Sequence, residues 1–468
     1  MSKPLVLDAD GTFLRTDMLF EAFWAGLGRA PFATLGALRH LGDLALFKAE
    51  LARIAQIRVD LLPVNEEVLA LARAAQDEGR EVILASASDE AQVRALAAHH
   101  GLSERVFASD GVTNLKSKAK AEALTQAFGA LGFDYAGNSK DDLAVWERAD
   151  QAIVVGRVEG APDEATHLAD GLHWRGLWKA IRPHQWVKNV LLLLPMIAAH
   201  EFDLAHLALT FCGIVAFCAA ASSIYVVNDL LDLEADRLHP TKCRRPFAAG
   251  RATIASGMVA CIALALIALG IGALLGGAFF GVVCLYMITS LAYSLQLKRM
   301  RWVDVATLAS LYTIRVVAGA AAGGVETSVY MLIFIFPVFI ALGCVKRLTE
   351  LTLATSDARL PGRGYGRPDR GDLLNVAGLG VFGALLIFFL YSVSDQGRAL
   401  YPDTWLMWLA MIPMAFWLIR MVVLGYIGKQ DYDPIVFALR DKLGLGILMI
   451  TLSLMFWAAG LWAQWFGG

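Results

Sequence analysis

Long apolar runs fill the chain after about residue 180, and they restrict what this sequence can fold into. A membrane-spanning helix needs about 20 mostly apolar residues. Nine windows meet or approach this length, and the first and sixth are the shortest: Pro183–Ala199, Leu204–Val227, Ser256–Leu275, Gly277–Leu297, Val303–Ala322, Val329–Cys344, Leu373–Val393, Trp405–Leu424 and Leu443–Trp462. The sequence therefore predicts an all-α membrane domain of nine transmembrane helices over residues 183–468.

The charged residues between these windows predict an orientation. If the amino terminus is cytosolic, the loops on its side hold 18 Lys or Arg, and the opposite loops hold only Arg398. Cytoplasmic loops of membrane proteins carry an excess of Lys and Arg. We therefore expect a cytosolic amino-terminal domain and a carboxyl terminus on the opposite side. Six cysteines all lie in the membrane half without a Cys-x-x-Cys pair, which favours reduced thiols.

Residues 1–157 have the charge density of a soluble domain and a different pattern. The apolar strands "PLVLDADGT", "EVILASAS", "FDYAGNS" and "QAIVVG" alternate with helical stretches. Strands that alternate with helices predict a parallel α/β sheet of Rossmann type, with its ligands at the carboxyl ends of the strands. Residues 16–80 read as helical, and residues 158–182 as a linker with a juxtamembrane helix.

The motifs at these strand ends resemble the haloacid dehalogenase-type phosphohydrolase superfamily, in order over residues 4–157. The resemblance implies that Asp8 is a nucleophile that forms an aspartyl-phosphate and that Asp10 is the general acid and base. It also implies a Mg²⁺ ion on Asp8, Asp10 and Asp142. The phosphate-binding residues would then be Ser86 and a lysine, either Lys120 or Lys116. The helical residues 16–80 would be the cap that covers the substrate.

One position departs from that superfamily. Its last motif usually carries Gly-Asp, whereas this chain has Gly137-Asn138. An asparagine removes a charge from the metal site and should weaken Mg²⁺ binding. The sequence therefore leaves two readings open, an active phosphatase and a degenerate domain with a structural or regulatory role.

A burst of charge follows the second apolar window, in "NDLLDLEADRLHPTKCRRP". Asp229, Asp232 and Asp236 are spaced i, i+3, i+7, which on one helix places them within an arc of about 60°. Three such carboxylates repel one another unless a cation joins them, and Mg²⁺ binds carboxylates together with substrate phosphates. Asn228 lies beside them. The cations that follow suit phosphate oxygens: Lys242, Arg244 and Arg245. The alternative is a solvated loop.

A second polar group lies at the start of the fifth window, in "YSLQLKRMRWVDV". We expect Lys298 and Asp304 to face the first cluster across a central cavity. Arg315 lies deep in an apolar helix, where a guanidinium indicates either a functional site or a structural ion pair.

The Asn-Asp-x-x-Asp-x-x-x-Asp motif and the nine windows resemble the UbiA superfamily of intramembrane prenyltransferases over residues 180–466. Within it, the decaprenyl-phosphate phosphoribosyltransferase subgroup resembles this chain in "RPHQWVKN", "HPTKCRRPFAAG", "YSLQLKR", "LYTIRVVAGA", "KRLTEL" and "DPIVFALRDK". In this chain, the single Asp304 stands where aromatic prenyltransferases of the superfamily carry a second motif, Asp-x-x-x-Asp.

The resemblance implies a bacterial cytoplasmic-membrane enzyme that transfers 5-phosphoribose from phosphoribosyl diphosphate to a polyprenyl phosphate. It implies Mg²⁺ on Asn228, Asp229, Asp232 and Asp236. Lys188 and Lys298 are candidates for the lipid phosphate, and the remaining substrate-binding candidates are Lys242, Arg244, Arg245, Tyr293, Asp304, Arg315 and Lys346. The amino-terminal domain would then remove the 5-phosphate of the product.

Three other readings stay open. The membrane domain is an ordinary prenyltransferase that uses a prenyl diphosphate and a small acceptor, or the chain is a transporter with a regulatory domain. In the third, the transferase carries an inert soluble scaffold. No nucleic-acid partner is expected, and the sequence does not indicate an oligomeric state.

Overall fold

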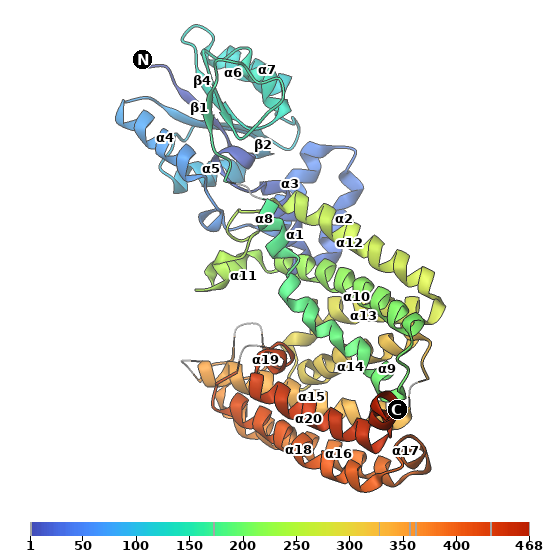
Figure 1. Cartoon of the computed structure of the whole chain (residues 1–468). Coiled ribbons are helices and arrows are strands. Elements are labelled where there is room, and N and C mark those ends of the chain that lie inside the picture. Colours follow the sequence, from blue (N-terminus) through green and yellow to red (C-terminus); the bar gives the residue numbers. More distant parts are fainter. Residues whose placement is uncertain are drawn as a thin grey trace. The chain divides into compact units, whose positions relative to one another are not determined.

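The computed structural model describes residues 2–171, 174–326, 328–354, 357–360, 363–430 and 433–467 (Figure 1). It divides into two compact units. One comprises Met1–Arg182 with Tyr225–Ile262, and the other Pro183–Ile224 with Ala263–Gly468. The divisions fall inside two long helices, α10 (Leu204–Leu231) and α12 (Ile254–Leu275). The aspartate motif therefore belongs to the same compact unit as the amino-terminal domain.

A six-stranded parallel sheet forms the core of the first unit, in the order β3-β2-β1-β4-β5-β6. The strands are β1 (Leu5–Asp8), β2 (Val82–Asp89), β3 (Val106–Ser109), β4 (Asp134–Gly137), β5 (Gln151–Val155) and β6 (Thr166–Leu168). The four expected strands are present, and β3 and β6 join them. Strand β6 lies inside the segment that was expected to be linker.

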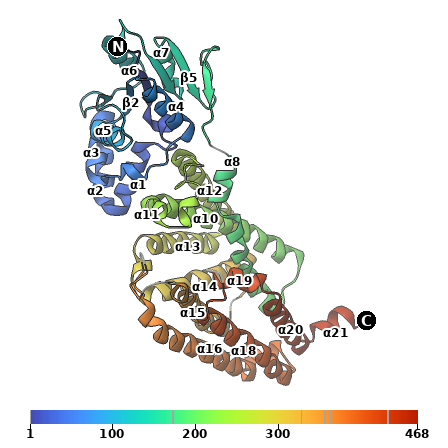
Figure 2. The ribbon, with the colours of Figure 1, turned by 90° about the vertical axis from the view of Figure 1, so that its left-hand side faces the viewer.

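Helices pack on both faces of this sheet (Figure 2). Alternate residues of β1 point to opposite sides, as strand geometry requires. Leu5 and Leu7 lie in a buried cluster with residues of α4 (Glu66–Asp77) and α5 (Glu90–His99). Val6 lies in a second cluster with residues of α6 (Lys118–Phe128) and α7 (Leu143–Trp146). This is the three-layer α/β arrangement that the alternating pattern predicted.

The helical cap is shorter than the expected residues 16–80. It consists of α1 (Met18–Arg29), α2 (Pro31–Ala37) and α3 (Leu44–Ala55), which share a buried cluster. Asp17 accepts hydrogen bonds from the backbone N–H groups of Leu19 and Phe20 at the start of α1, which is a typical helix cap. Helix α4 packs on the sheet instead, because its buried face carries apolar side chains at helical spacing.

The carboxyl-terminal end of α10 packs against cap helix α1. Trp24 of α1 shares a buried cluster with Val226 and Leu230 of α10 and with Leu233 of α11 (Leu233–Leu238). Ala180 of α8 (Trp174–Ala180) belongs to the same cluster. The first unit thus joins the soluble domain to the helix ends that carry the aspartate motif.

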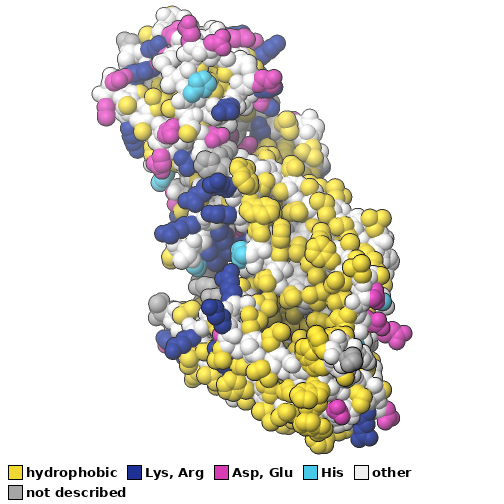
Figure 3. Space-filling model, in the orientation of Figure 1, with side chains coloured by type: hydrophobic (Ala, Val, Ile, Leu, Met, Phe, Trp, Pro, Cys, Tyr) yellow, Lys and Arg dark blue, Asp and Glu magenta, His cyan; other side chains and the backbone are white. Residues whose placement is uncertain are grey.

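Seven helices among the described residues are long and apolar enough to cross a membrane. Besides α10 and α12 they are α13 (Gly277–Leu295), α14 (Val303–Gly323), α15 (Val329–Leu353), α16 (Arg370–Val393, with the preceding 3₁₀ turn) and α18 (Thr404–Tyr426). The sixth window, Val329–Cys344, is the first part of α15, which continues to Leu353 and has 25 residues. Hydrophobic side chains cover most of the surface over the long helices on the face that Figure 3 shows.

The count of nine spans is not confirmed, because the first and last windows are interrupted. The first consists of a 3₁₀ helix, Pro183–Leu193, followed by the short helix α9 (Leu194–Ala199), which has Pro195 in its first turn. The last contains the 17-residue helix α20 (Lys442–Ala458) and stops before Gly460, whose φ is 73°. A proline lacks a backbone donor, and a left-handed residue ends a helix.

The second unit is held together by a buried cluster from α14, α15, α16 and α18. Close approach of backbones contributes to this packing. A Cβ atom on Gly319 of α14 would lie 1.9 Å from the carbonyl oxygen of Leu192, so no other residue fits there without movement. Small residues at such crossings are typical of helix packing in membranes.

Candidate active sites

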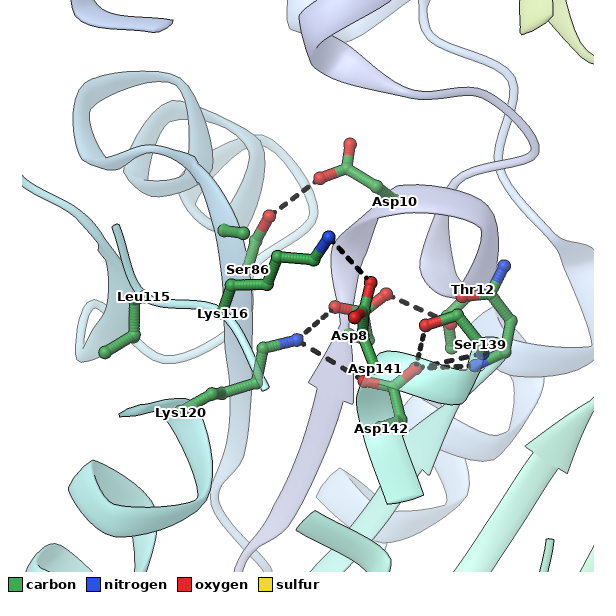
Figure 4. A network of polar contacts seen from close by, with 12 residues as sticks. Asp8, Asp10, Thr12, Ser86, Leu115, Lys116, Lys120, Ser139, Asp141 and Asp142 are labelled. Atoms are coloured by element: carbon green, nitrogen blue, oxygen red, sulfur yellow. Dashed lines mark hydrogen bonds and ion pairs between the residues drawn. The ribbon is translucent and has the colours of Figure 1, made fainter. Parts of the chain in front are cut away.

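The first candidate site lies at the carboxyl end of β1 (Figure 4). Lys120 from α6 donates to Asp8 at 2.7 Å and lies 3.5 Å from Asp142. Tyr135 donates to Asp142 at 2.7 Å. Burial raises the pKa of Asp8 to about 8, and the Lys120 ammonium opposes that shift. Of the two candidate lysines, Lys120 thus contacts Asp8 and Asp142, whereas Lys116 pairs with exposed Asp141.

Asp10 lies two residues beyond Asp8 and is fixed from three sides. One oxygen accepts hydrogen bonds from the hydroxyls of Ser86 at 2.8 Å and Ser88 at 2.7 Å, both on β2. The other oxygen accepts from the backbone N–H of Met18 at 2.8 Å, in the first turn of α1. The carboxylate that is the expected acid and base is therefore held by the cap as well as by the sheet.

The cap also brings a lysine to this site. Lys48 of α3 donates to the carbonyl of Ala87 at 2.6 Å and to the side chain of Asn114 at 2.9 Å. Burial holds the pKa of Lys48 below its usual value, although the carboxylates of Asp10 and Asp17 oppose that shift. Sequence reasoning missed Lys48 and Ser88. Lys48 has no local motif, whereas Ser88 stands two residues after Ser86 on the same strand.

Asn138 packs against the loop that follows Asp8. A Cβ atom on Gly11, whose φ is 77°, would lie 2.1 Å from the amide nitrogen of Asn138. The backbone N–H of Asn138 donates to Asp142 at 3.1 Å. Asn138 therefore adjoins the carboxylate cluster without adding a charge to it.

The donor set at this edge fits a divalent cation. Asp8 and Asp142 are buried, and Lys120 is the cation that contacts both of them. Three carboxyl groups, including that of Asp10, outnumber the two nearby ammonium groups of Lys120 and Lys48. Carboxylate oxygens are the ligands that Mg²⁺ prefers, and an excess of buried negative charge is costly unless a cation joins it.

The second candidate site lies where α10 ends. The helix is interrupted at Asp232, which is the amino-terminal cap of α11, so the motif spans two helices and not one. Its outer members still meet, because Arg245 donates to Asp229 at 3.0 Å and to Asp236 at 2.7 Å. Arg182 forms a further ion pair with Asp229.

Arg182 was not among the predicted site residues, although the motif "RPHQWVKN" begins with it. Its φ of 52° is unusual for a residue other than glycine, and such strain persists only where the surroundings impose it. Its guanidinium also lies 5.2 Å from the ring centre of Tyr225. The sequence signal was the position itself, directly before the first apolar window.

The remaining predicted members of this site differ in exposure. Asn228 and Asp232 are half-buried, whereas Lys242 and Arg244 are exposed on the loop after α11. The three carboxylates with Asn228 again supply oxygen ligands of the kind Mg²⁺ takes, and the two nearby guanidinium groups of Arg182 and Arg245 suit phosphate oxygens.

An ion pair connects this second site to the cap. Glu21 of α1 accepts from Arg237 of α11 at 2.5 and 3.0 Å, with side chains only 4% and 7% exposed. Glu21 also accepts from the hydroxyl of Thr16 at 2.7 Å. A weaker, exposed pair joins Arg29 to Glu234. A bidentate pair at this depth is a strong geometric restraint between α1 and α11.

In the second unit, Asp304 is fully buried and held by arginines. Arg347 of α15 donates to its two oxygens at 2.5 and 2.9 Å, and Tyr293 donates at 2.9 Å. Arg363 adds a bond of 3.2 Å. Arg347 is itself fully buried and also pairs with Glu350 at 2.5 Å. Sequence reasoning found Asp304 and Tyr293 but missed Arg347, although it directly follows Lys346.

A further carboxylate, Asp433, gathers two of the predicted lysines. Lys188 lies 2.5 Å and Lys346 3.7 Å from Asp433, and Tyr312 donates to it at 3.2 Å. Burial raises the pKa of Asp433, but the two ammonium groups outweigh it and hold the pKa well below its usual range. Asp433 is the first residue of the motif "DPIVFALRDK", but it was not among the predicted site residues.

Arg315 lies buried in α14 among polar groups. It donates to the side chain of Asn189 at 3.0 Å, to the hydroxyl of Tyr286 at 2.9 Å and to the carbonyl of Leu311 at 2.7 Å. Its guanidinium lies 4.8 Å from the ring centre of Tyr286. Lys298 is half-buried in a 3₁₀ turn, Leu297–Arg299. The expected placement of Lys298 and Asp304 opposite the aspartate motif stays a prediction.

Comparison with known proteins gives the membrane half a family. The model of the UbiA prenyltransferase family matches residues 190–358. The decaprenyl-phosphate phosphoribosyltransferase of Mycobacterium tuberculosis is 32% identical over 272 residues, which cover 57% of this chain and 88% of that protein. The chain belongs to the UbiA prenyltransferase family.

Two further similarities extend over the amino-terminal half. The uncharacterised protein y4nM of Sinorhizobium fredii is 34% identical over 457 residues, or 94% of this UbiA-family chain and 88% of that protein. The solved structure of a HAD family hydrolase from Salmonella enterica covers 36% of this chain and 68% of that one, with 15% identity and a TM-score of 0.27.

The buried pair between cap and aspartate motif leads to a first prediction for this UbiA-family protein. In Glu21→Gln, Arg237 keeps its charge but loses its carboxylate partner while buried. Removing one member of a buried ion pair costs roughly 3 kcal/mol or more. We expect the first unit to unfold at a clearly lower denaturant concentration, as followed by pulse proteolysis of the purified protein.

Glu50→Gln is the matched control, because Glu50 pairs with Arg53 on the same cap but at the surface. Exposed pairs contribute about 0–1 kcal/mol. Equal unfolding midpoints for the two variants would show that the Glu21–Arg237 pair does not hold the unit together.

Proposed function

We propose that this UbiA-family membrane protein transfers 5-phosphoribose from phosphoribosyl diphosphate to a polyprenyl phosphate. We further propose that its amino-terminal domain then removes the 5-phosphate. The observation that carries this proposal is the arrangement at the end of α10, where Arg245 joins Asp229 and Asp236 and Arg182 adds a second guanidinium. Carboxylates for a metal and cations for phosphate thus occur in one place. The donor and acceptor follow the name of the Mycobacterium tuberculosis relative.

In the transfer step, Asn228, Asp229, Asp232 and Asp236 would hold Mg²⁺, which neutralises charge on the departing diphosphate. Arg182 and Arg245 exchange their carboxylate partners for phosphate oxygens when the donor binds. The bond between the anomeric carbon and the diphosphate breaks, and the diphosphate leaves with the electron pair. An oxygen of the lipid phosphate forms the new bond. That oxygen is already anionic near neutral pH, so the step needs no strong general base.

The second unit supplies cations for the acceptor in this scheme. Lys188 and Lys346 share Asp433, and an incoming phosphate would compete with that carboxylate for both lysines. Arg347 is held by Asp304 and Glu350 on three sides, so we assign it a positioning role for Tyr293 and Arg363. These two side chains contact the same carboxylate.

In the phosphatase step, Asp8 attacks phosphorus, and the bond to the ribose 5-oxygen breaks. Asp10 donates a proton to that leaving oxygen, and it later takes a proton from the water that hydrolyses the aspartyl-phosphate. Ser86 and Lys120 hold the phosphate oxygens, and Asp8, Asp10 and Asp142 would hold Mg²⁺. Lys48 from the cap adds a cation at the entrance.

The connection between the sites supports a sequence of two reactions. Cap helix α1 packs on the end of α10, and its Glu21 pairs with Arg237. In the sequence, Arg237 directly follows Asp236 of the aspartate motif and precedes the loop that carries Lys242, Arg244 and Arg245. A product released near α11 therefore meets the phosphatase at a raised effective concentration. The competing reading, an inert soluble domain, is favoured by Asn138, which replaces an expected carboxylate ligand.

The test is product analysis by mass spectrometry. Purified protein receives polyprenyl phosphate, phosphoribosyl diphosphate and Mg²⁺ together, and we expect polyprenyl-phosphoryl-ribose without its 5-phosphate. A parallel reaction supplies decaprenyl diphosphate with a small aromatic acceptor. Prenylation of that acceptor without ribose transfer would overturn the proposed transfer. A lipid product that keeps its 5-phosphate would instead favour the inert domain.

A further inference from the structure

An apolar surface covers the outer side of the cap. Its members are large hydrophobic side chains of α2, α3 and the turn between them, with exposed fractions of 40–89%: Phe32, Leu35, Leu41, Leu44 and Leu46. We call these five residues the cap apolar surface. Phe32, 89% exposed, is as open as a side chain in an unfolded chain. Large exposed hydrophobic residues concentrated in one segment, here residues 32–46, indicate an interaction site.

Few charged residues accompany the exposed hydrophobic side chains of this segment. Residues 31–46 read "PFATLGALRHLGDLAL" and include only two charged side chains, Arg39 and Asp43. Asp43 accepts from the backbone N–H of Leu46 at 3.2 Å, as the cap of α3. The segment therefore presents its apolar residues outward while Thr34, Ala37 and Phe47 face the interior of the cap.

The position of the cap indicates what covers this surface. Helix α1 lies between two buried clusters, and Phe23 belongs to both. One cluster joins α1 to α2 and α3, and the other joins α1 to Val226 and Leu230 of α10. Since α10 is a membrane-spanning helix that ends at Leu231, α1 lies at the level where this helix leaves the bilayer. Helices α2 and α3 pack directly on α1, so they lie within about one helix diameter, about 10 Å, of that level.

A second element of the same unit has the composition of an interfacial helix. Helix α8 carries Trp174, 76% exposed, and Trp178, 51% exposed, next to Arg175 and Lys179. Its Ala180 packs in the cluster that contains the end of α10. Tryptophan beside basic residues is typical of the boundary between water and lipid.

We propose that the cap apolar surface lies in the interfacial layer of the lipid bilayer, so that the cap of the amino-terminal domain is a membrane-binding element. The headgroup layer is about 5–8 Å thick on each side, which is close to the diameter of one helix, about 10 Å. The bilayer is always present beside α10, whereas a protein partner would have to be recruited. A lipid surface also accepts Phe and Leu side chains without requiring a matching shape.

This contact would keep the phosphatase on lipid-linked substrates. Lys48, which reaches the site from α3, is two residues beyond Leu46 of the cap apolar surface. A phosphorylated sugar on a lipid phosphate enters such a site without leaving the bilayer. This consequence rests on the proposed function, whereas the membrane contact does not.

The test measures lipid contact directly in the full-length protein. A fluorescent amino acid is incorporated at position 32 or 35, and the protein is reconstituted in nanodiscs of phosphatidylcholine and phosphatidylglycerol with or without a nitroxide on the upper acyl chain. Leu131, 41% exposed at the opposite edge of the sheet, is the matched control position. We expect at least about twofold stronger quenching by the nitroxide lipid at positions 32 and 35 than at position 131.

Equal quenching at the three positions would overturn the proposal. Protection of position 32 from aqueous iodide without quenching by the nitroxide lipid would also overturn it, in favour of a second protein copy on this surface. A separate activity arm uses Phe32→Asp with Leu35→Asp. We expect a loss of at least about fivefold in hydrolysis of the lipid-linked phosphate and an unchanged rate with the water-soluble p-nitrophenyl phosphate.

The two arms separate the failure of this inference from failure of the proposed function. Strong lipid quenching in a protein that hydrolyses neither phosphate confirms the membrane contact and overturns the phosphatase. Equal effects of the double substitution on both phosphates would instead indicate damage to the cap, and in that case the quenching result alone decides.

Discussion

Asp229→Asn is expected to abolish ribose transfer, with a loss of at least about a hundredfold in rate. The substitution removes a carboxylate that contacts both Arg182 and Arg245 and that would hold the metal. The diphosphate then leaves without its full charge compensation. The measurement is formation of the lipid-linked phosphoribose from labelled phosphoribosyl diphosphate, at several Mg²⁺ concentrations, because weaker metal binding predicts a partial recovery at high Mg²⁺.

Glu234→Gln is the matched control for this experiment. It removes a carboxylate from the same motif region, but Glu234 lies on the other side of α11 in an exposed pair with Arg29. We expect its transfer rate within about twofold of the parent protein. Hydrolysis of added lipid-linked 5-phosphate by the Asp229→Asn protein reports that the first unit is folded. A full transfer rate in Asp229→Asn would remove the aspartate motif from the reaction.

Asp8→Asn should stop the pathway one step later. Without the carboxylate nucleophile, we expect dephosphorylation to fall by about 10⁴-fold or more, while ribose transfer continues. The phosphorylated lipid then accumulates, which mass spectrometry detects as the only labelled lipid. Ribose transfer should continue because Asp8 lies in a separate cluster with Lys120 and Asp142. Among the described contacts, no residue of the aspartate motif belongs to that cluster.

The control for the second experiment is Asp150→Asn, in which an exposed aspartate near Lys3 loses its charge. Its phosphatase rate should match the parent protein. If Asp8→Asn still produced the dephosphorylated lipid at the parent rate, another enzyme or a degenerate first domain would explain the product, in line with the reading that Asn138 supports.

Several features followed from local sequence alone. The apolar windows predicted seven helices that the structure contains, because length and hydropathy suffice where every backbone polar group must bond inside its own helix. The pattern of β1 and the motif after it predicted Asp8 and Asp10 at a strand end, and the resemblance added Ser86 and a lysine, either Lys120 or Lys116. In the structure Ser86 contacts Asp10, and Lys120 contacts Asp8. Parallel strands bring their carboxyl ends to one edge regardless of the loops between them.

Other features depended on partners that are distant in sequence. Arg347, Asp433 and Arg182 became visible only as the partners of Asp304, Lys188 and Asp229, since ion pairing across helices leaves no periodic signal. The same holds for Lys48, which α3 carries to the phosphatase edge. The interruption of the motif at Asp232 was also missed, because helix spacing assumes that a helix continues.

The sequence by itself determined the two kinds of domain and seven of the membrane helices, and it predicted candidate site residues, since these depend on composition, periodicity and short motifs. Only the tertiary structure decided that the aspartate motif belongs with the soluble domain in one compact unit, through Glu21, Arg237 and the apolar contacts of α1 with α10. Those contacts join residues about 200 positions apart. Their energy comes from desolvation and pairing in the folded chain, and no local segment records it.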